Sequence, residues 1–316
     1  MKTGMATPKF DRKKHFLTLL DYDEKEVREM LRLALDMKSG RVRKRLEGKT
    51  LGMLFQKNST RTRISFEAGM TRLGGHAIFL DFSTTQLGRG ETIADTSRVL
   101  ARYCDAVMAR LNKQADLEEL AKHSSVPVIN GLTELYHPCQ IMADMLTVFE
   151  KKGDVDGLKV VFLGDCGFNM FHSIAIGFSK LGASVVGACP NAAYEPKPEV
   201  WKAAKAQAKR GAAALSIERD PVKAVTGADV VITDTWVSMG QDAEKEKRLR
   251  ELSSYQLNAS LLAHAKKDAI VLHCLPAHRG QEITDEVIDG PRSVVFDEAE
   301  NRLHAQNAVM VKLLKA

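Results

Sequence analysis

The 316-residue chain is long enough for two domains, and its 44% hydrophobic and 27% charged residues are typical of a globular protein with a sizeable core. Lysine and arginine exceed aspartate and glutamate by only 46 to 40, and the charges are mixed along the chain, which argues against a nucleic-acid-binding module. No apolar stretch reaches the length of about eighteen residues that a membrane span needs, and the N-terminus lacks the apolar core of a secretory signal.

The first half of the chain alternates short apolar runs with helical stretches. Buried strands are predicted over residues 50–55, 76–82, 105–111 and 127–130. Helices are predicted over residues 63–74, 92–103 and 139–152. In the first of these helices Phe66, Met70 and Leu73 recur at the spacing of one helical face, so this face is expected to pack inward.

A second series of apolar runs follows the polar, glycine-containing stretch 149–157, where we place the domain division. Strands are predicted over residues 159–165, 183–190, 214–220, 229–236, 269–276 and 293–299, and helices over 197–210 and 255–267. Because strands and helices alternate along the whole chain, the sequence predicts an α/β fold of two domains, each a parallel sheet flanked by helices. The expected domains are residues 1–150 and 151–302, with a terminal helix over 303–316 that returns to the first domain.

Polar side chains follow many of these predicted strands. In open parallel sheets ligands gather beyond the carboxyl ends of the strands, so these residues are candidates for one common site. The candidates are residues 59–63, Arg110, His137, Gln140, Asp165, Asn169, Asp234, 238–240 and 273–276. Their convergence is stronger evidence for a site than any single motif.

The stretch 59–63 combines a good helix N-cap, Ser59, with hydroxyl and guanidinium side chains. The free backbone N–H groups of a helix start bind anions, and Arg61 could add a two-pronged contact to a phosphate. An ordinary capped helix with exposed arginines is the alternative. The Walker motif GxxxxGK[ST] is missing, which disfavours a nucleoside triphosphate.

Three other candidates have plain structural alternatives. His137 precedes a proline at a predicted helix entrance, where it could hydrogen-bond a carbonyl oxygen or simply cap or fill the core. Cys274 could be a nucleophile or a small buried hydrophobe. Arg110, at the end of a predicted strand, needs an anionic partner because burying an unpaired guanidinium is costly.

The distribution of cysteine and histidine bears on metals and on the cellular compartment. The 5 cysteines are scattered, odd in number and never in a CxxC pair, so we expect reduced thiols and a cytoplasmic protein. HExxH and clustered His/Cys spacings are also missing, so the sequence predicts no metal site.

The motifs STRTR (59–63), HPCQ (137–140), DTWVSMG (234–240) and HCLPAHRG (273–280) follow one another in this order. Together with LGRGETIADTSRVLARY and FDEAENRLHAQ, they closely resemble the ornithine carbamoyltransferases of the aspartate/ornithine carbamoyltransferase superfamily. The resemblance covers the chain from about Phe16 to its end. It implies an active site in the cleft between two α/β domains, no metal, no organic cofactor and usually a homotrimer or a multiple of trimers.

The resemblance also implies residue roles, with carbamoyl phosphate on the first domain and ornithine on the second. Carbamoyl phosphate would be bound by Ser59, Thr60, Arg61, Thr62, Arg110, His137, Gln140, Arg302 and by Gln86 from a neighbouring subunit. Ornithine would contact Asn169, Asp234, Ser238, Met239, Cys274 and Leu275. The expected catalytic residues are Arg110, His137, Asp234 and Cys274. The loop residues 166–168 depart from the family's usual pattern, which affects the pocket expected for the ornithine carboxylate.

The implied reaction is attack of the ornithine δ-amine on the carbamoyl carbon, which yields citrulline and phosphate and most naturally serves arginine biosynthesis. Thr62, Arg110 and His137 would stabilise the oxyanion, and the helix start with Arg61 would stabilise the leaving phosphate. The amine has an ordinary pKa of about 10.4, so it must lose a proton before attack. Cys274 or the departing phosphate could accept that proton.

Several alternatives remain open on the sequence alone. A catabolic direction and putrescine as substrate stay within the same chemistry. Aspartate carbamoyltransferases share STRTR and HPxQ, but their dicarboxylate substrate calls for more cationic contacts than the region around Asp234 and Cys274 offers. A nicotinamide dehydrogenase would need GxGxxG where this chain has GDCGFN, and an acidic residue after the strand 183–190.

Overall fold

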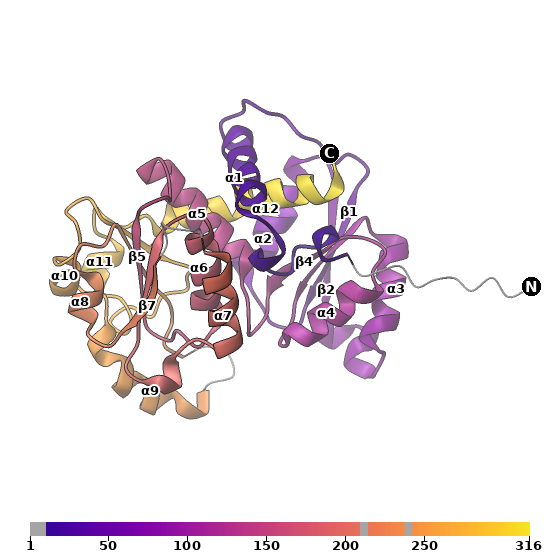
Figure 1. The fold of residues 1–316 in the computed structure, drawn as a ribbon. Coiled ribbons are helices and arrows are strands. Elements are labelled where there is room, and N and C mark those ends of the chain that lie inside the picture. The colour runs from indigo at the N-terminus through magenta and orange to yellow at the C-terminus, as the bar shows by residue number, and fades with distance from the viewer. Residues whose placement is uncertain (1–10, 209–213, 238–241) are drawn as a thin grey trace, which may run out of the picture.

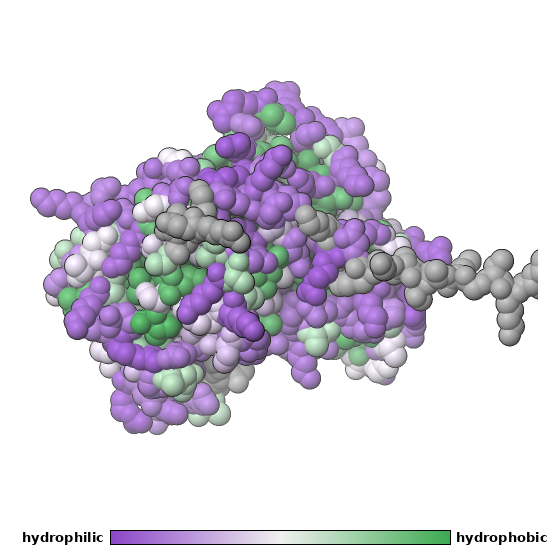
Figure 2. All heavy atoms as spheres, viewed as in Figure 1, coloured by the Kyte–Doolittle hydropathy of each residue, from purple (hydrophilic) through white to green (hydrophobic). Residues whose placement is uncertain are grey.

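The computed structural model describes residues 11–208, 214–237 and 242–316. Within these ranges no helix has both the length and the apolar character to cross a lipid bilayer. Hydrophilic residues cover most of the face shown in Figure 2, and hydrophobic residues come to the surface in smaller groups over the second domain. The end of the predicted helix 197–210, and the predicted ornithine contacts Ser238 and Met239, lie outside the described residues.

The first domain is built on a parallel sheet with the strand order β2-β1-β3-β4. Its strands are β1 (Thr50–Phe55), β2 (His76–Asp81), β3 (Ala106–Arg110) and β4 (Val128–Leu132). The helices of this half are α1 (Glu24–Lys38), α2 (Thr60–Arg72), α3 (Ile93–Tyr103), α4 (Gln114–His123) and α5 (Pro138–Lys152). The side chains of β3 are buried along the whole strand, as expected for a parallel sheet covered on both faces.

The second domain has a parallel sheet with the order β7-β6-β5-β8-β9. Its strands are β5 (Lys159–Leu163), β6 (Ser184–Ala188), β7 (Leu215–Glu218), β8 (Val230–Thr233) and β9 (Ile270–His273). The helices are α6 (Asn169–Lys180), α7 (Pro198–Gln207), α8 (Pro221–Val225), α9 (Lys245–Leu252), α10 (Ala259–Leu262), α11 (Asp285–Ile288) and α12 (Val295–Leu314). The α/β prediction of two parallel sheets flanked by helices is therefore confirmed (Figure 1).

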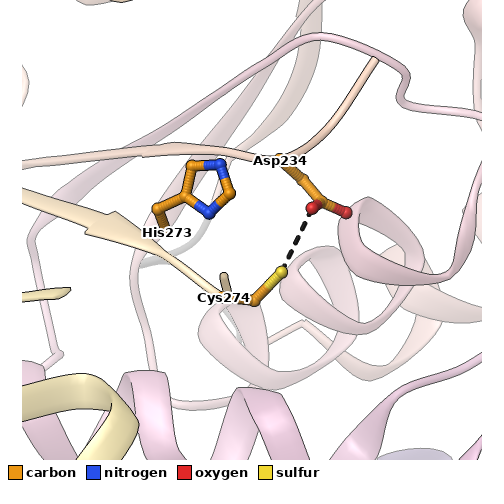
Figure 3. Close-up of side chains that lie close together, drawn as sticks. All are labelled: Asp234, His273 and Cys274. Carbon is orange, nitrogen blue, oxygen red and sulfur yellow. Dashed lines mark hydrogen bonds between the residues drawn. The ribbon is translucent and has the colours of Figure 1, made fainter. Parts of the chain in front are cut away.

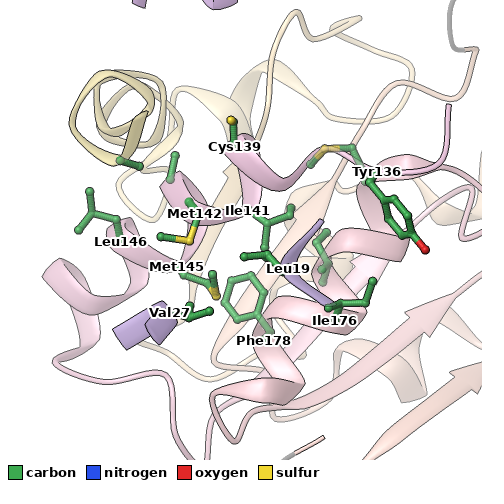
Figure 4. Packing of buried hydrophobic residues seen from close by; sticks show 14 of the residues in the cluster. Leu19, Val27, Tyr136, Cys139, Ile141, Met142, Met145, Leu146, Ile176 and Phe178 are labelled. Carbon is green, nitrogen blue, oxygen red and sulfur yellow. The ribbon is translucent and has the colours of Figure 1, made fainter. Parts of the chain in front are cut away.

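The two domains share a core where α5 packs against α6. Figure 4 shows Ile141 and Met145 of α5 directed toward Phe178 of α6, with Leu19 beside them. The helices approach closely because α6 has a glycine here. A Cβ atom placed on Gly177 would lie 2.8 Å from a methyl carbon of Ile141, which is nearer than side-chain atoms pack. A continuous hydrophobic contact thus fixes the two sheets relative to each other.

Helix α12 crosses from the second domain to the first, drawn in yellow in Figure 1. It begins next to β9, where the Val294 N–H donates to the Val271 carbonyl (3.0 Å). It then packs against α5, α1 and α2. Near its far end Lys312 forms an ion pair with Glu29 of α1 (3.0 Å). The last helix therefore belongs to the packing of both halves.

The predicted strand over 293–299 is wrong. Its β-branched valines favour a strand locally, but only Ser293 forms an isolated bridge, with Val271. From Val295 the chain is helical. Burial follows the helical spacing, because Val295 and Glu298 are buried while Phe296 is 66% exposed.

The helix predicted over 255–267 is also wrong for most of its length. Within it only the short α10 is an α-helix, and it is capped by the Asn258 side chain, which accepts from the Leu261 N–H (2.9 Å). Before it, Leu257 bridges Ile283, and after it the His264 carbonyl accepts the Gly227 N–H. These backbone contacts to neighbouring segments override the apolar periodicity that suggested a longer helix.

Candidate active site

A cavity of about 510 Å³ lies between the two domains, at the carboxyl ends of the strands of both sheets. Residues that follow β1, β4, β5, β8 and β9 line it together with residues of α12 and the end of β3. The predicted site residues found in its lining are Ser59, Thr60, Arg61, Thr62, Arg110, His137, Gln140, Asn169, Asp234, Cys274, Leu275 and Arg302. Side chains 240 positions apart are therefore brought to one cavity, as Thr62 and Arg302 show.

The first turn of α2 forms one wall. Ser59 is the N-cap, and its hydroxyl oxygen accepts the Thr62 N–H (3.3 Å), as the sequence predicts. The Ser59 hydroxyl also donates to Thr62 Oγ1 (3.1 Å), which holds the threonine side chain in place. The remaining backbone N–H groups of this turn and the positive end of the helix dipole are available to an anion.

Three guanidinium groups gather at this wall: Arg61 on α2, Arg110 at the end of β3 and Arg302 on α12. Arg110 is only 6% exposed, and its Nε atom has no hydrogen-bond partner within the described structure. Burial and the neighbouring Arg302 lower the pKa of Arg110 to about 10, so it remains protonated at neutral pH. No described carboxylate forms an ion pair with any of the three, so the cluster is suited to an external anion with more than one negative charge.

His137 is the N-cap of α5, beside this cluster. Its backbone N–H donates to Ser173 Oγ (2.8 Å), whereas its ring Nδ1 is buried without a partner in the described structure. Burial, and then Arg302, Arg110 and Arg61, lower the pKa of His137 well below its ordinary value. The neutral imidazole can therefore donate one N–H to a carbonyl oxygen without adding charge.

Gln140 and Arg302 connect the helices around the cavity. Arg302 Nη1 donates to Gln140 Oε1 (2.7 Å), and Arg302 Nη2 lies 3.3 Å from Thr62 Oγ1. The N-terminal turns of α2 and α5 are thus linked through α12. An acyl oxygen or amide placed here would meet both a hydrogen-bond acceptor, Gln140, and several donors.

The opposite wall comes from the second domain. Asn169, at the start of α6, donates an amide N–H to the Thr133 carbonyl of the first domain (2.6 Å). Asp234 accepts the Thr235 N–H (2.7 Å) and the thiol of Cys274 (3.1 Å). The carboxylate of Asp234 is suited to a cationic amine, because it faces the cavity and forms no ion pair within the described residues.

Cys274 is held as a thiol. Burial and the adjacent Asp234 raise its pKa well above the ordinary value. A group that keeps its own proton at neutral pH is a hydrogen-bond donor rather than a base. The geometry therefore weighs against Cys274 as the proton acceptor, which the sequence left open.

Asp234, His273 and Cys274 are the described residues whose side-chain atoms come close enough to hold a metal ion, within 4.8 Å of one another (Figure 3). Hydrogen bonds account for their proximity. The His273 Nδ1 atom accepts the Leu275 N–H (2.9 Å), and its Nε2 atom faces Glu282 Oε1 (3.1 Å). Both ring nitrogens of His273 are hydrogen-bonded within the protein and the Cys274 thiol donates to Asp234, so this set fits a structural role better than a metal site.

Not every predicted residue reaches the cavity. Gln86, in the short 3-10 helix Gln86–Arg89, is exposed and lies outside its lining. This is compatible with the expectation that it acts on a neighbouring subunit. The lining also includes residues to which the prediction gave no binding or catalytic role: Lys57, Asn58, Leu132, Phe168, Met170, Thr235, Val237, Pro276 and His278. Thr235 and Val237 belong to the motif 234–240, and Pro276 and His278 belong to the motif 273–280. Their positions in these motifs could have indicated that they line the site.

Two segments of the chain match profiles of known protein families. Residues 14–150 match the profile described as aspartate/ornithine carbamoyltransferase, carbamoyl-P binding domain, and residues 156–313 match that of the Asp/Orn binding domain of the same family. The chain belongs to the aspartate/ornithine carbamoyltransferase family. This membership excludes the dehydrogenase alternative and makes the chain a carbamoyltransferase.

Among its relatives in this carbamoyltransferase family, the chain is 54% identical to an ornithine carbamoyltransferase of Pyrococcus horikoshii over 302 residues, which cover 94% of this chain and 95% of that one. It is 53% identical to the anabolic ornithine carbamoyltransferase of Pyrococcus furiosus, with the same coverage. A solved structure of ornithine carbamoyltransferase from that organism superposes with a TM-score of 0.89 and covers 94% of this chain and 96% of its own.

Proposed function

We propose that this chain is an ornithine carbamoyltransferase that transfers the carbamoyl group of carbamoyl phosphate to the δ-amine of L-ornithine and releases L-citrulline and phosphate. The observation that carries the proposal is the cavity whose two walls are opposite in charge. The first-domain wall offers Arg61, Arg110 and Arg302, and the second-domain wall offers Asp234. The relatives named ornithine carbamoyltransferase support this choice within the family.

In this proposal residues 1–150, completed by 303–316, bind carbamoyl phosphate, and residues 151–302 bind ornithine. The phosphate is held by residues 59–62, among which Arg61 supplies the positive charge. Arg110, His137 and Gln140 surround the carbamoyl group. Gln86 completes the site of a neighbouring subunit. Asn169, Asp234, Leu275 and the residues 238–239 contact ornithine.

The chemistry follows from the charges. The neutral δ-amine forms a bond to the carbamoyl carbon, and the carbonyl oxygen becomes negative next to Thr62, Arg110 and the N–H of neutral His137. The C–O bond to phosphate then breaks, and the leaving phosphate departs toward Arg61 and the start of α2. Because Cys274 holds its own proton, the phosphate is the better acceptor for the proton that the amine loses.

The decisive test is a citrulline assay in which ornithine, putrescine and aspartate are offered in parallel with carbamoyl phosphate. We expect ornithine to exceed the other two amines by at least about a hundredfold in kcat/KM, because a site built to pair charged groups rejects analogues that lack them. Reactions without enzyme correct for spontaneous carbamoylation. Carbamoyl-aspartate or carbamoyl-putrescine as the main product would overturn the proposal.

The anabolic direction, toward arginine, is the better supported one, since a relative with 53% identity is named anabolic. A cytoplasmic location is inferred from the cysteines, which are all free thiols. The reaction as written needs neither a metal nor an organic cofactor.

We also infer that the chain forms a homotrimer or a multiple of trimers. Large apolar side chains are exposed on α2, β2 and α3: Ile64 (57%), Ile78 (41%), Val99 (46%) and Tyr103 (76%). Strand β2 is also an edge of its sheet. Exposed apolar side chains next to an open sheet edge are typical of a subunit interface.

Replacing Tyr103 by glutamate should dissociate this assembly, because a charge would be buried in the interface. Analytical ultracentrifugation should give a mass of three times 34.9 kDa, or a multiple of that, for the unmodified protein and a smaller species for the variant. The matched control is Phe296→Glu, which changes another strongly exposed aromatic residue, 66%, on a different helix. A monomeric unmodified protein would contradict the inference.

A further inference from the structure

Two buried carboxyl groups lie behind the cavity and have no part in the mechanism above. Asp144 is on α5, one turn after Gln140, and Glu298 is on α12, one turn before Arg302. They are 0% and 1% exposed. Neither forms an ion pair with a lysine, arginine or histidine of the described chain. Buried carboxyl groups without such a partner are costly, so their presence here needs a reason.

Both groups bind the same amide nitrogen. Gln140 Nε2 donates to Asp144 Oδ1 (2.9 Å) and to Glu298 Oε1 (2.8 Å). An amide nitrogen has two N–H groups, and both are used. The Gln140 oxygen must therefore point the other way, toward Arg302 Nη1 (2.7 Å) and the cavity. A flipped amide would set its oxygen against two carboxyl oxygens.

The environment allows this pair only one negative charge. Burial raises the pKa of Asp144 to about 7, and burial together with Asp144 raises the pKa of Glu298 well above its ordinary value. Two carboxyl oxygens that accept from one nitrogen atom lie close to each other, and Asp144 Oδ2 has no hydrogen-bond partner in the described structure, so a proton on one carboxyl group relieves the repulsion between them. The charged groups that face the pair are Arg302 on α12 and Asp234 after β8, while β9 contributes the His273 N–H.

We propose that Asp144 and Glu298 form a carboxyl pair that shares one proton and positions Gln140 as the acceptor for the amide of the carbamoyl group. This inference rests on the proposed function. The pair is a positioning device, because neither residue lines the cavity. Glu298 Oε2 also accepts the His273 N–H (2.8 Å), so Glu298 also holds the end of β9, next to Cys274.

The first measurement does not depend on activity. Isotope-edited infrared spectroscopy, with labelled aspartate and glutamate, should show a protonated carboxyl group at neutral pH. The Asp144→Asn variant should lose that band, because its amide N–H replaces the shared proton and Glu298 stays ionised. A spectrum of the unmodified protein without a protonated carboxyl, or an unchanged spectrum in Asp144→Asn, would overturn the proposal.

The second measurement is kinetic. Asp144→Asn keeps one negative charge and should retain kcat within about threefold at pH 7. In Asp144→Asn/Glu298→Gln both partners can donate as well as accept, so the Gln140 amide is no longer held in one orientation and kcat should fall at least about tenfold, the effect of one misplaced hydrogen bond. In the unmodified protein the KM for carbamoyl phosphate should rise as alkaline pH removes the shared proton, since a second negative charge then repels the dianion. Asp144→Asn should not show this rise.

The matched control is Glu300→Gln, two residues along the same helix, whose carboxylate pairs with His304 (3.3 Å) among the described residues. It should leave kcat and the pH profile unchanged. A double variant that retains full kcat, or identical alkaline profiles for the unmodified protein and Asp144→Asn, would overturn the positioning role. Absence of citrulline formation by the unmodified protein, with the protonated-carboxyl band present, would instead refute the proposed function and the positioning role while supporting the shared proton.

Discussion

Arg61→Ala is expected to lower kcat for citrulline formation by at least about a hundredfold, because loss of one donor to developing charge typically costs about 3 kcal/mol. The KM for carbamoyl phosphate should rise as well, since Arg61 would contact the phosphate in both the ground state and the transition state. The fold should be unaffected. Burial lowers the pKa values of Arg110 and Arg302, and repulsion from Arg61 adds to this effect, so removal of Arg61 relieves a cluster of like charges.

Arg63→Ala is the matched control, in the same motif and on the same helix. Its guanidinium pairs with Glu67 (3.0 Å) and stacks over the Phe79 ring (3.8 Å), away from the cavity lining. We expect it to keep kcat within about threefold, in line with the small energies of exposed ion pairs. Steady-state kinetics and thermal unfolding of both variants provide the test. More than a tenth of the original kcat in Arg61→Ala would remove this residue from the phosphate site.

Asp234→Asn is expected to raise the KM for ornithine by about a hundredfold or more, with a much smaller effect on carbamoyl phosphate. Removing one partner of a buried charge pair costs about 2–5 kcal/mol, and the lost partner here is that of the ornithine α-amine. The amide keeps the size of the carboxylate, so the cavity should not collapse. Binding of inorganic phosphate, measured by calorimetry, should be unchanged or slightly stronger because a negative charge has gone.

Asp229→Asn provides the control at the opposite end of the same strand. Asp229 immediately precedes β8, where it accepts the Lys159 N–H (2.9 Å) and pairs with Lys266 (2.7 Å). This variant should lower stability and leave the KM for ornithine within about threefold. If Asp234→Asn weakened ornithine and phosphate equally, Asp234 would not belong to the ornithine pocket.

The central parallel strands were predictable because they are short buried runs of apolar residues, as in β5 and β8. Two predicted elements, the strand 293–299 and the helix 255–267, are wrong. Val294 and Val295 are β-branched, yet they lie at the start of helix α12. They are buried there because one face of α12 packs inward, whereas a strand would bury alternate residues. Around Leu257 the apolar residues have helical spacing, but the backbone is irregular and forms an isolated bridge to Ile283. Local pattern could not distinguish these cases from regular elements.

For the candidate site, the residues that follow strands could be predicted from their position alone. Arg302 could not, because it lies on the last helix, 162 residues from its partner Gln140, and only the family resemblance suggested it. Asp144 and Glu298 were missed for a related reason. Their significance depends on a shared amide and on burial, which appear only after α5 and α12 have packed together.

The path of α12 has a consequence for the order of events during synthesis. N-terminal domains usually fold first as a chain leaves the ribosome. Here α1, α2 and α5 pack against α12, which ends at Leu314. The N-terminal half therefore leaves the exit tunnel while its apolar surface that contacts α12 is still uncovered. The second sheet can form in the meantime. Arg302, a member of the cationic cluster, also lies on that helix, so the nascent protein acquires its complete anion-binding site only after α12 has been made and has docked.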